Sequence, residues 1–208
     1  VVAGSACAYP GDPGIILDEG MMWAGHPEES NGPYGVAKRA LLTMTEAYGK
    51  QHGLRYNFII STNMYGPGDN FDLQSGHVIP ALIKKFSAAA DAGDPFVKCI
   101  GTGEAKRDLL YVEDAAQAFL DCAERCDQNT VTNIGSGGEI EVRVLARKIA
   151  NACGYKGDIL WDAVGPNGQR SRQLLIRRAQ QLFGFAPKVS LDEGLERTVA
   201  SFCGVKSE

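Results

Sequence analysis

Pro33-Tyr34-Gly35-Val36-Ala37-Lys38 opens a segment in which apolar side chains recur every three or four residues. This spacing predicts a helix over 33–51, and Gly53 supplies a residue that commonly ends one. Side chains four positions apart lie on the same face of a helix, so Tyr34 and Lys38 point in the same direction. This pair, together with the order of the elements around it, decides the fold.

Strands are expected on both sides of this helix. Residues 1–8 are apolar or small and precede a Tyr9-Pro10-Gly11 turn, which predicts a buried strand. A loop rich in Gly, Pro and Glu then leads to the helix, and Leu54 to Ile60 has the pattern of a second strand. Ligands bind at the carboxyl ends of parallel strands, and Ser5 stands near the end of the first.

Helices and strands continue to alternate along the rest of the chain. Further helices are expected over 78–90, 112–125, 141–152 and 191–203, the last with a Ser190–Glu193 capping box. Further strands are expected over 96–100, 131–134 and 158–162. The predicted fold class is therefore α/β, with a doubly wound and largely parallel sheet plus a smaller α/β domain.

The composition excludes several classes of protein. The 208 residues are 44% hydrophobic and 22% charged, which is typical of a folded domain and not of a disordered chain, a collagen or a coiled coil. No apolar run reaches the roughly 18 residues of a membrane span. The net charge of -4 argues against a nucleic-acid partner. The six cysteines include no Cys-x-x-Cys pair, so we expect reduced thiols, a cytoplasmic location and no metal site.

Tyr34 and Lys38 together suit proton transfer at an oxygen atom. An ammonium beside a phenol favours the phenolate, and such a tyrosine can exchange a proton with a carbinol or carbonyl oxygen. The hydroxyl of Ser5 would hold the same oxygen. A Tyr and a Lys four apart also occur by chance on many helix surfaces. The order strand, Ser5, loop, helix, strand and then Tyr65-Gly66-Pro67 favours the catalytic interpretation.

Five stretches carry a family resemblance. They are Gly4-Ser5-Ala6-Cys7-Ala8-Tyr9-Pro10, Pro33–Lys38, Thr62–Phe71, His77–Phe86 and Arg107–Asp114. Together they resemble the extended short-chain dehydrogenase/reductase family, whose members are NAD-dependent nucleotide-sugar epimerases, dehydratases and reductases. The Ser-x-Cys and His-Val-Ile-Pro stretches are most similar to the GDP-L-fucose synthase group. The resemblance extends from residue 1 to about residue 203.

The resemblance implies roles for five catalytic residues. Ser5, Tyr34 and Lys38 would manage proton transfer while a hydride passes from NADPH to a C4 ketone. Cys7 as base and His77 as acid would invert the neighbouring C3 and C5, where protons are acidic because of the ketone. Cys7 follows Ser5 by two residues, which would place both side chains on one face of a strand.

The resemblance also implies contacts for a cofactor and a substrate. The cofactor is expected to be NADP, with NAD as the alternative. The residues implied to bind it are Gly4, Ser5, Tyr34, Lys38, Asn63, Met64 and His77. Lys85 and Arg107, with Asn63, would bind the nucleotide-diphosphate sugar, because paired cations suit paired phosphates.

Each of these residues has a simpler interpretation that the residues alone leave open. Cys7 is equally a small buried side chain, and His77 a polar residue at a helix entry. Arg107 would then pair with a neighbouring carboxylate, Glu104 or Asp108. Lys85 would belong to a solvated helix face.

Two features depart from the family pattern. The family opens with a strand, a Gly-x-x-Gly-x-x-Gly turn and a helix that hold the cofactor pyrophosphate, and no such turn precedes Ser5. We therefore expect the chain to start inside a longer protein and to have little activity alone. Ile100 and Lys85 stand where the fucose synthases carry Trp and Arg, so the sugar and the base stay open.

The resemblance implies a partial Rossmann-like dinucleotide-binding domain at 1–66. A nucleotide-sugar domain would occupy most of 67–208, with elements around 96–135 returning to the first sheet. The implied reaction converts GDP-4-keto-6-deoxymannose to GDP-L-fucose. The alternatives are a 4-epimerase or dehydratase with tightly bound NAD, which needs no second acid/base pair, and a non-catalytic binding module. The expected partners are a GDP-sugar and a second copy of the chain, but no nucleic acid and no membrane.

Overall fold

The computed structural model of the chain describes all residues except 12–13, 74, 165–168 and 205–208. The chain divides into two compact units. The first contains Val1–Met64, Asp108–Glu139 and Ser171–Lys188, and the second contains Tyr65–Arg107, Ile140–Arg170 and Val189–Glu208. Each unit is thus assembled from three separate segments of the sequence.

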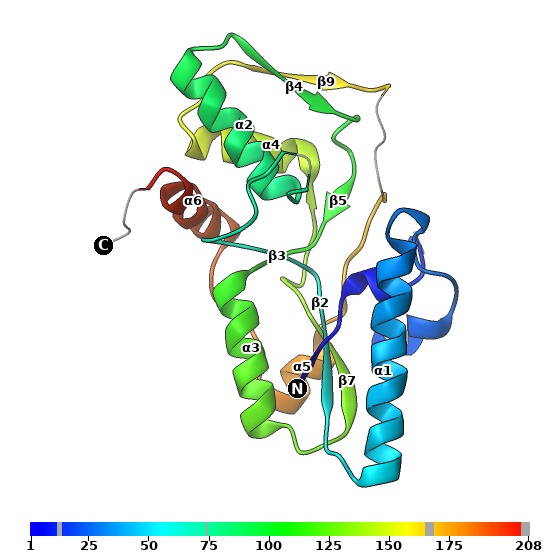
Figure 1. The fold of residues 1–208 in the computed structure, drawn as a ribbon. Helices are drawn as coiled ribbons and strands as arrows, with labels where there is room; N and C mark the ends of the chain where they lie inside the picture. The colour runs from blue at the N-terminus through cyan, green and yellow to red at the C-terminus, as the bar shows by residue number, and fades with distance from the viewer. Residues whose placement is uncertain (12–13, 74, 165–168, 205–208) are drawn as a thin grey trace. The chain divides into compact units, whose positions relative to one another are not determined.

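A parallel sheet of short strands forms the centre of the first unit (Figure 1). Its order is β1 (Val2–Ala3), β2 (Asn57–Ser61) and β7 (Thr130–Ile134). In register, Phe58 of β2 lies opposite Val2 on one side and Val131 on the other. All residues of β2 are buried, as expected of a central strand that is covered on both faces.

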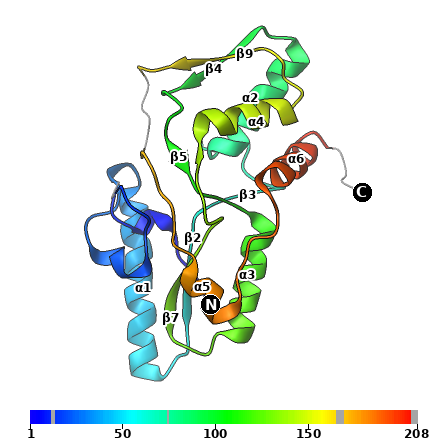
Figure 2. The same ribbon diagram turned by 180° about the vertical axis from the view of Figure 1, so that it is seen from behind.

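Helices cover both faces of this sheet (Figures 1 and 2). Successive side chains of a strand point to opposite faces, so Phe58 and Ile60 join one apolar cluster and Ile59 joins the other. The first cluster includes Leu42 of α1 (Gly32–His52). The second includes residues of α3 (Val112–Arg125) and α5 (Arg177–Phe183). This doubly wound arrangement confirms the predicted fold class.

Helix α1 packs on the first unit through a narrow buried edge. Gly35, Leu42 and Thr45 are its buried residues, and neighbouring atoms lie very close to the helix backbone at Gly35. A Cβ atom at Gly35 would lie 2.4 Å from the carbonyl oxygen of Cys7 and 2.7 Å from the Cβ of Pro27. Only a residue without a side chain therefore lets the start of α1 pack this closely against residues 6–8.

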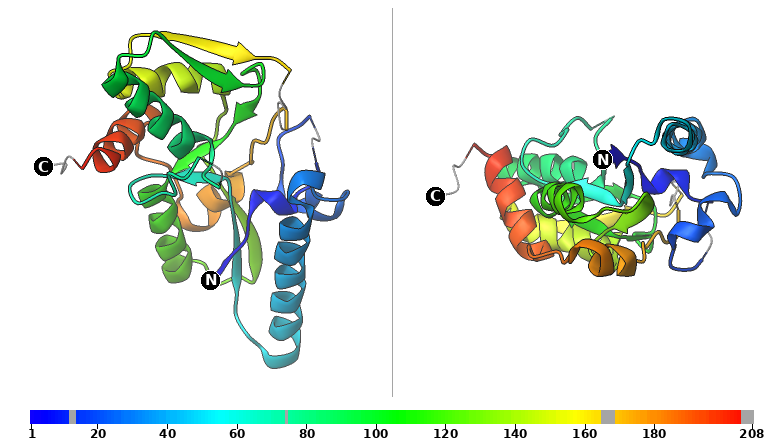
Figure 3. Two further views of the ribbon diagram at one scale, coloured as in Figure 1. Left: turned by 45° about the horizontal axis from the view of Figure 1, so that its top comes forward. Right: turned by 90° about the horizontal axis from the view of Figure 1, so that it is seen from below.

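Three of the described helices pack together in the second unit: α2 (Val78–Ala92), α4 (Val142–Ala152) and α6 (Leu191–Phe202). The parallel pair β4 (Phe96–Ile100) and β9 (Asp158–Asp162) lies beside α2 and α4 (Figure 3). An antiparallel pair, β5 (Lys106–Arg107) and β8 (Ile140–Glu141), completes the unit. The Ser190 hydroxyl accepts a hydrogen bond from the Glu193 amide at 3.3 Å, as the capping box predicts.

The long predicted helices and most predicted strands are confirmed, but the strand expected over 1–8 is wrong. β1 ends at Ala3, and a 3-10 helix, η1, follows at Ala6–Ala8. Five further elements are too short for the sequence pattern to predict: β3 (Asn63–Tyr65), β6 (Leu109–Tyr111), β5, β8 and α5. The assignment of residues 1–66 to a dinucleotide-binding domain, and of most of 67–208 to a nucleotide-sugar domain, stays a prediction.

Over the residues that the structure describes, no helix combines the length and the apolar character that crossing a membrane requires.

Candidate active site

Ser5 lies just past the carboxyl end of β1, where the backbone packs closely on β2. The Gly4 amide donates to the carbonyl of Ile59 at 2.6 Å, and a Cβ at Gly4 would lie 2.4 Å from a ring carbon of Phe58. Gly4 therefore serves close packing here. Ser5 then caps η1, and its hydroxyl accepts a hydrogen bond from the amide of Cys7 at 3.2 Å.

This geometry corrects the expected relation between Ser5 and Cys7. The strand ends before Ser5, so the alternation of side chains along a strand does not apply to the pair. They are brought together by the tight turn of η1 instead. Cys7 is partly exposed, so it is not the fully buried small side chain of the simpler interpretation.

Tyr34 and Lys38 share one side of the first turns of α1, as their spacing predicts. The Lys38 ammonium lies 5.5 Å from the centre of the Tyr34 ring and donates a 2.9 Å hydrogen bond to the carbonyl oxygen of Ala3. It therefore reaches the last residue of β1, two positions before Ser5. Tyr34 is half exposed, and no hydrogen bond joins it to Ser5 in the part of the chain that the structure describes.

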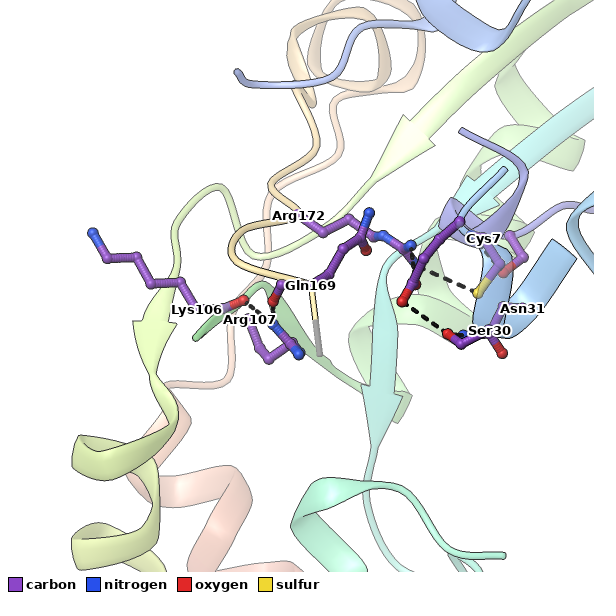
Figure 4. Close-up of polar contacts among 9 residues, drawn as sticks. Cys7, Ser30, Asn31, Lys106, Arg107, Gln169 and Arg172 are labelled. Carbon is purple, nitrogen blue, oxygen red and sulfur yellow. Dashed lines mark hydrogen bonds and ion pairs between the residues drawn. The ribbon is translucent and has the colours of Figure 1, made fainter. Parts of the chain in front are cut away.

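Cys7 has a cationic neighbour that the sequence analysis missed. The Arg172 guanidinium donates to the Cys7 sulfur, with Nη1 and Sγ 3.4 Å apart, and Figure 4 shows the arginine pointing at the thiol. Its other terminal nitrogen, Nη2, lies 3.1 Å from a carboxylate oxygen of Glu28. Because 165 positions separate Arg172 from Cys7, no local pattern could have revealed the contact.

Asp108 organises the backbone around the segment that carries Arg172. Its buried carboxylate accepts hydrogen bonds from the amide and hydroxyl of Ser136, both at 2.8 Å, and from the amide of Leu174 at 3.3 Å. Burial raises the pKa of Asp108 to about 6, although the Ser136 and Leu174 hydrogen bonds favour the carboxylate. The expected alternative of an Arg107–Asp108 surface pair does not fit a carboxylate enclosed in this way.

Asn63 and Met64 lie on β3, directly after the buried Thr62, whose hydroxyl donates to the carbonyl of Asp108 at 2.8 Å. Asn63 is partly exposed and Met64 is 41% exposed. Both positions are thus anchored through the backbone, while their side chains keep access to solvent or to a ligand.

Three of the expected site residues belong to the second unit. His77 is the exposed N-cap residue of α2, and its side chain makes no capping hydrogen bond. The Lys85 ammonium donates to the carbonyl of Lys98, a contact that leaves its charge in place. Arg107 donates from Nη1 to the carbonyls of Lys106 and Gln169, both at 2.7 Å (Figure 4). Glu104, the other expected partner of Arg107, forms an ion pair with Arg143.

Ser5, Cys7, Tyr34 and Lys38 thus belong to the first unit, and His77, Lys85 and Arg107 to the second. All six cysteines are free. Within the described residues, no three His, Cys, Asp or Glu side chains are grouped as metal ligands.

Comparison with known proteins gives matches over nearly the whole chain. A family model described as the NAD dependent epimerase/dehydratase family matches residues 1–135. The GDP-L-fucose synthase of Sinorhizobium fredii is 38% identical over 199 residues, a match that covers 96% of this chain and 63% of that protein. The Escherichia coli GDP-L-fucose synthase is 36% identical over 208 residues, covering 96% and 64%. The chain therefore spans somewhat less than two thirds of the length of these relatives.

Solved structures also match over nearly the whole chain. A GDP-L-fucose synthetase from Naegleria fowleri bound to NADP superposes with a TM-score of 0.91 at 24% identity, covering 97% of this chain and 65% of that one. A UDP-glucose 4-epimerase from Thermotoga maritima with UDP-glucose has a TM-score of 0.83 at 29% identity, covering 97% and 62%. The fold is therefore shared with a GDP-L-fucose synthetase and with a UDP-glucose 4-epimerase.

Proposed function

The chain belongs to the NAD dependent epimerase/dehydratase family, and on this premise we propose that it acts as a nucleotide-sugar epimerase/reductase. The substrate is GDP-4-keto-6-deoxymannose and the product GDP-L-fucose. The proposal rests on one observation above all: Lys38 contacts the last residue of β1 while Tyr34 lies beside it, so the pair is held near Ser5. The names of the most similar curated relatives support the choice of sugar nucleotide.

The residues at the end of β1 fit the nicotinamide end of NADP. A hydroxyl, a phenol and an ammonium are the groups needed to hold a ribose and to move one proton at a ketone. NADPH, when bound, supplies the hydride for C4. Ser5 holds the ketone oxygen, Tyr34 donates the proton that this oxygen requires, and the Lys38 charge favours the phenolate that remains. NAD is the alternative cofactor.

Cys7 and His77 carry out the second part of the reaction. The thiolate of Cys7 removes the protons at C3 and C5, which the adjacent ketone makes acidic, and His77 returns protons to the opposite faces. Inversion requires one base and one acid on opposite sides of the sugar, and these are the roles proposed for Cys7 and His77. Lys85 and Arg107 of the second unit bind the diphosphate, and Asn63 contacts the sugar.

A 4-epimerase with tightly bound NAD is the second candidate, favoured by the likeness to the Thermotoga maritima 4-epimerase. Such an enzyme uses Ser5, Tyr34 and Lys38 but has no need of Cys7 and His77. A non-catalytic binding module would need none of the five. The discriminating observation is whether protons at C3 and C5 exchange with solvent.

We further propose a homodimer that forms through α1. The exposed face of this helix is unusually apolar: Val36, Met44 and Tyr48 are each more than half exposed. A second copy of α1 would cover these side chains in a two-fold arrangement. The six free cysteines support a reducing, cytoplasmic location.

The proposed activity is tested by Tyr34→Phe, with Tyr48→Phe as the matched control. Both tyrosines are half exposed on α1, but only Tyr34 lies beside Lys38. The natural protein that carries these residues is supplied with NADPH and the GDP-keto sugar, and NADPH consumption is followed by absorbance. Tyr34→Phe should lower turnover by about 100-fold or more, because it removes a general acid. Equal effects of the two changes would refute the assignment, and unchanged turnover in both would favour a different catalytic group.

A further inference from the structure

Arg172, which contacts Cys7, is held by hydrogen bonds at its backbone and at its side chain. At the backbone, the Glu139 carboxylate accepts hydrogen bonds from the Arg172 amide at 2.7 Å and from the Ser171 hydroxyl at 2.8 Å. At the side chain, Glu28 holds Nη2 at 3.1 Å. Glu28 is itself fixed, because the Ser30 hydroxyl donates to its other oxygen at 2.8 Å.

The backbone around Arg172 is tied to the same unit by further hydrogen bonds. The Leu17 amide donates to the carbonyl of Gln173, and the Leu175 amide donates to the carbonyl of Leu17. The buried carboxylate of Asp108 accepts from the Leu174 amide. These bonds fix the backbone from which the Arg172 side chain extends, and its contacts with Glu28 and Cys7 set the direction of the guanidinium.

Because the Arg172 guanidinium is buried, its charge is balanced by the few acceptors that contact it. Arg172 is only 9% exposed, and its Nε atom is buried with no hydrogen-bond partner among the described residues. The acceptors that face its terminal nitrogens are the Glu28 carboxylate and the Cys7 sulfur. An opposite charge nearby favours the charged form of an ionisable group, so the guanidinium beside Cys7 favours an anionic sulfur.

We propose that Arg172 is the positioning residue of Cys7: its guanidinium fixes the sulfur and stabilises the thiolate. Its relevance to catalysis rests on the proposed function, in which Cys7 must be an anion before it can accept a proton from carbon. Glu28 has the opposite electrostatic effect, because its negative charge offsets part of the arginine's. An electrostatic role and a purely structural role of the ion pair therefore predict different effects on Cys7 when Arg172 or Glu28 is replaced.

The test measures the rate at which iodoacetamide alkylates Cys7 at pH 7.5 in the natural protein that carries these residues. Each cysteine is quantified separately by peptide mass spectrometry, and the exposed Cys203 of the second unit serves as the internal rate standard. Iodoacetamide reacts with the thiolate, so the rate reports how far that form is stabilised. Arg172→Gln should slow Cys7 about tenfold, the effect of losing one hydrogen bond to a charged group. Arg172→Lys should restore part of the rate.

Glu28→Gln provides the control for a merely structural role. It keeps an oxygen that can accept from Arg172 but removes the negative charge, so Cys7 should react at least as fast as in the unaltered chain. A purely structural ion pair predicts that both Arg172→Gln and Glu28→Gln change the rate in the same direction. The completely buried Cys122 reports unfolding, because it should stay unreactive in every variant.

Two results would overturn the proposal: a Cys7 rate in Arg172→Gln within twofold of the unaltered chain, or equal slowing in Arg172→Gln, Arg172→Lys and Glu28→Gln. If Arg172→Gln exposes Cys122, Arg172→Lys is compared with Glu28→Gln instead. Equal slowing of Cys7 in these two variants would overturn the proposal. The experiment uses neither cofactor nor sugar. Its outcome is therefore separate from that of the Tyr34→Phe assay, and either proposal can fail without the other.

Discussion

Individual polar side chains in this protein occupy two contrasting environments. Tyr34 and Lys38 are near the surface, where solvent and ligands reach them, and their relation is set by helical spacing. Asp108 is buried and holds three separate hydrogen bonds inside the first unit. A carboxylate in such a place strengthens the local structure, but its charge is costly to bury.

The titration of Asp108 should be visible in the pH dependence of stability. Burial raises its pKa to about 6 in the folded chain, against 3.8 for the unperturbed group. The folded state therefore binds the proton more tightly than the unfolded state, and the free energy of unfolding gains up to ~3 kcal/mol from this group as pH falls from 7 to 4. Urea unfolding of the unaltered chain and of Asp108→Asn at several pH values measures the difference.

Asp127→Asn is the matched control, because Asp127 is exposed and forms a surface ion pair with Arg55. Its removal should leave the pH dependence unchanged. If Asp108→Asn shows the same pH dependence as the unaltered chain, Asp108 titrates as an ordinary exposed carboxyl group and the account of its burial is wrong.

At the scale of elements, long periodic segments were predictable and short ones were not. The 3.6-residue spacing over 33–51 and the capping signals gave α1, α3, α4 and α6 to within a few residues. The strand expected over 1–8 failed because Gly4, Ser5 and Ala6 carry no strand preference, and Ser5 caps η1 instead. The two- and three-residue strands are held by tertiary pairing and leave no periodic signal.

The candidate site could be predicted only where a local pattern exists. The shared helix face of Tyr34 and Lys38 follows from their spacing, and the choice of Ser5 follows from its place near the end of the first strand. The resemblance supplied Cys7 and His77, and the roles of all five residues remain proposals. Arg172 and Asp108 were not predictable as site residues, because their roles depend on chain segments that meet only in the folded unit.

Gly35 should be essential for placing α1. A methyl group there would overlap the Cys7 carbonyl, so Gly35→Ala should lower the free energy of unfolding by about 1–3 kcal/mol through overpacking. Gly32→Ala is the control: it is also near the start of α1, but a Cβ there meets nothing within 4 Å. Urea unfolding compares the two. Equal small effects would mean that α1 can move away from Cys7 at no cost.

At the scale of the whole molecule, the proposed dimer rests on the exposed apolar side chains of α1. Met44→Glu should convert the proposed dimer to a monomer, because a charge would be buried at its centre. Lys50→Glu places the same new side chain near the end of the helix and should leave the dimer intact. Sedimentation velocity of the natural protein measures both. A monomer at all concentrations without any substitution would contradict the dimer.

The proposed chemistry assigns the base to Cys7 and the acid to His77. The most direct test is turnover of the GDP-keto sugar by the natural protein in deuterated water, with the product examined by NMR. The account predicts deuterium at C3 and C5 of GDP-L-fucose. Cys7→Ser should abolish this exchange, while Tyr34→Phe should allow the exchange but stop reduction. Reduction without deuterium at C3 and C5, or exchange that is unchanged in Cys7→Ser, would contradict it.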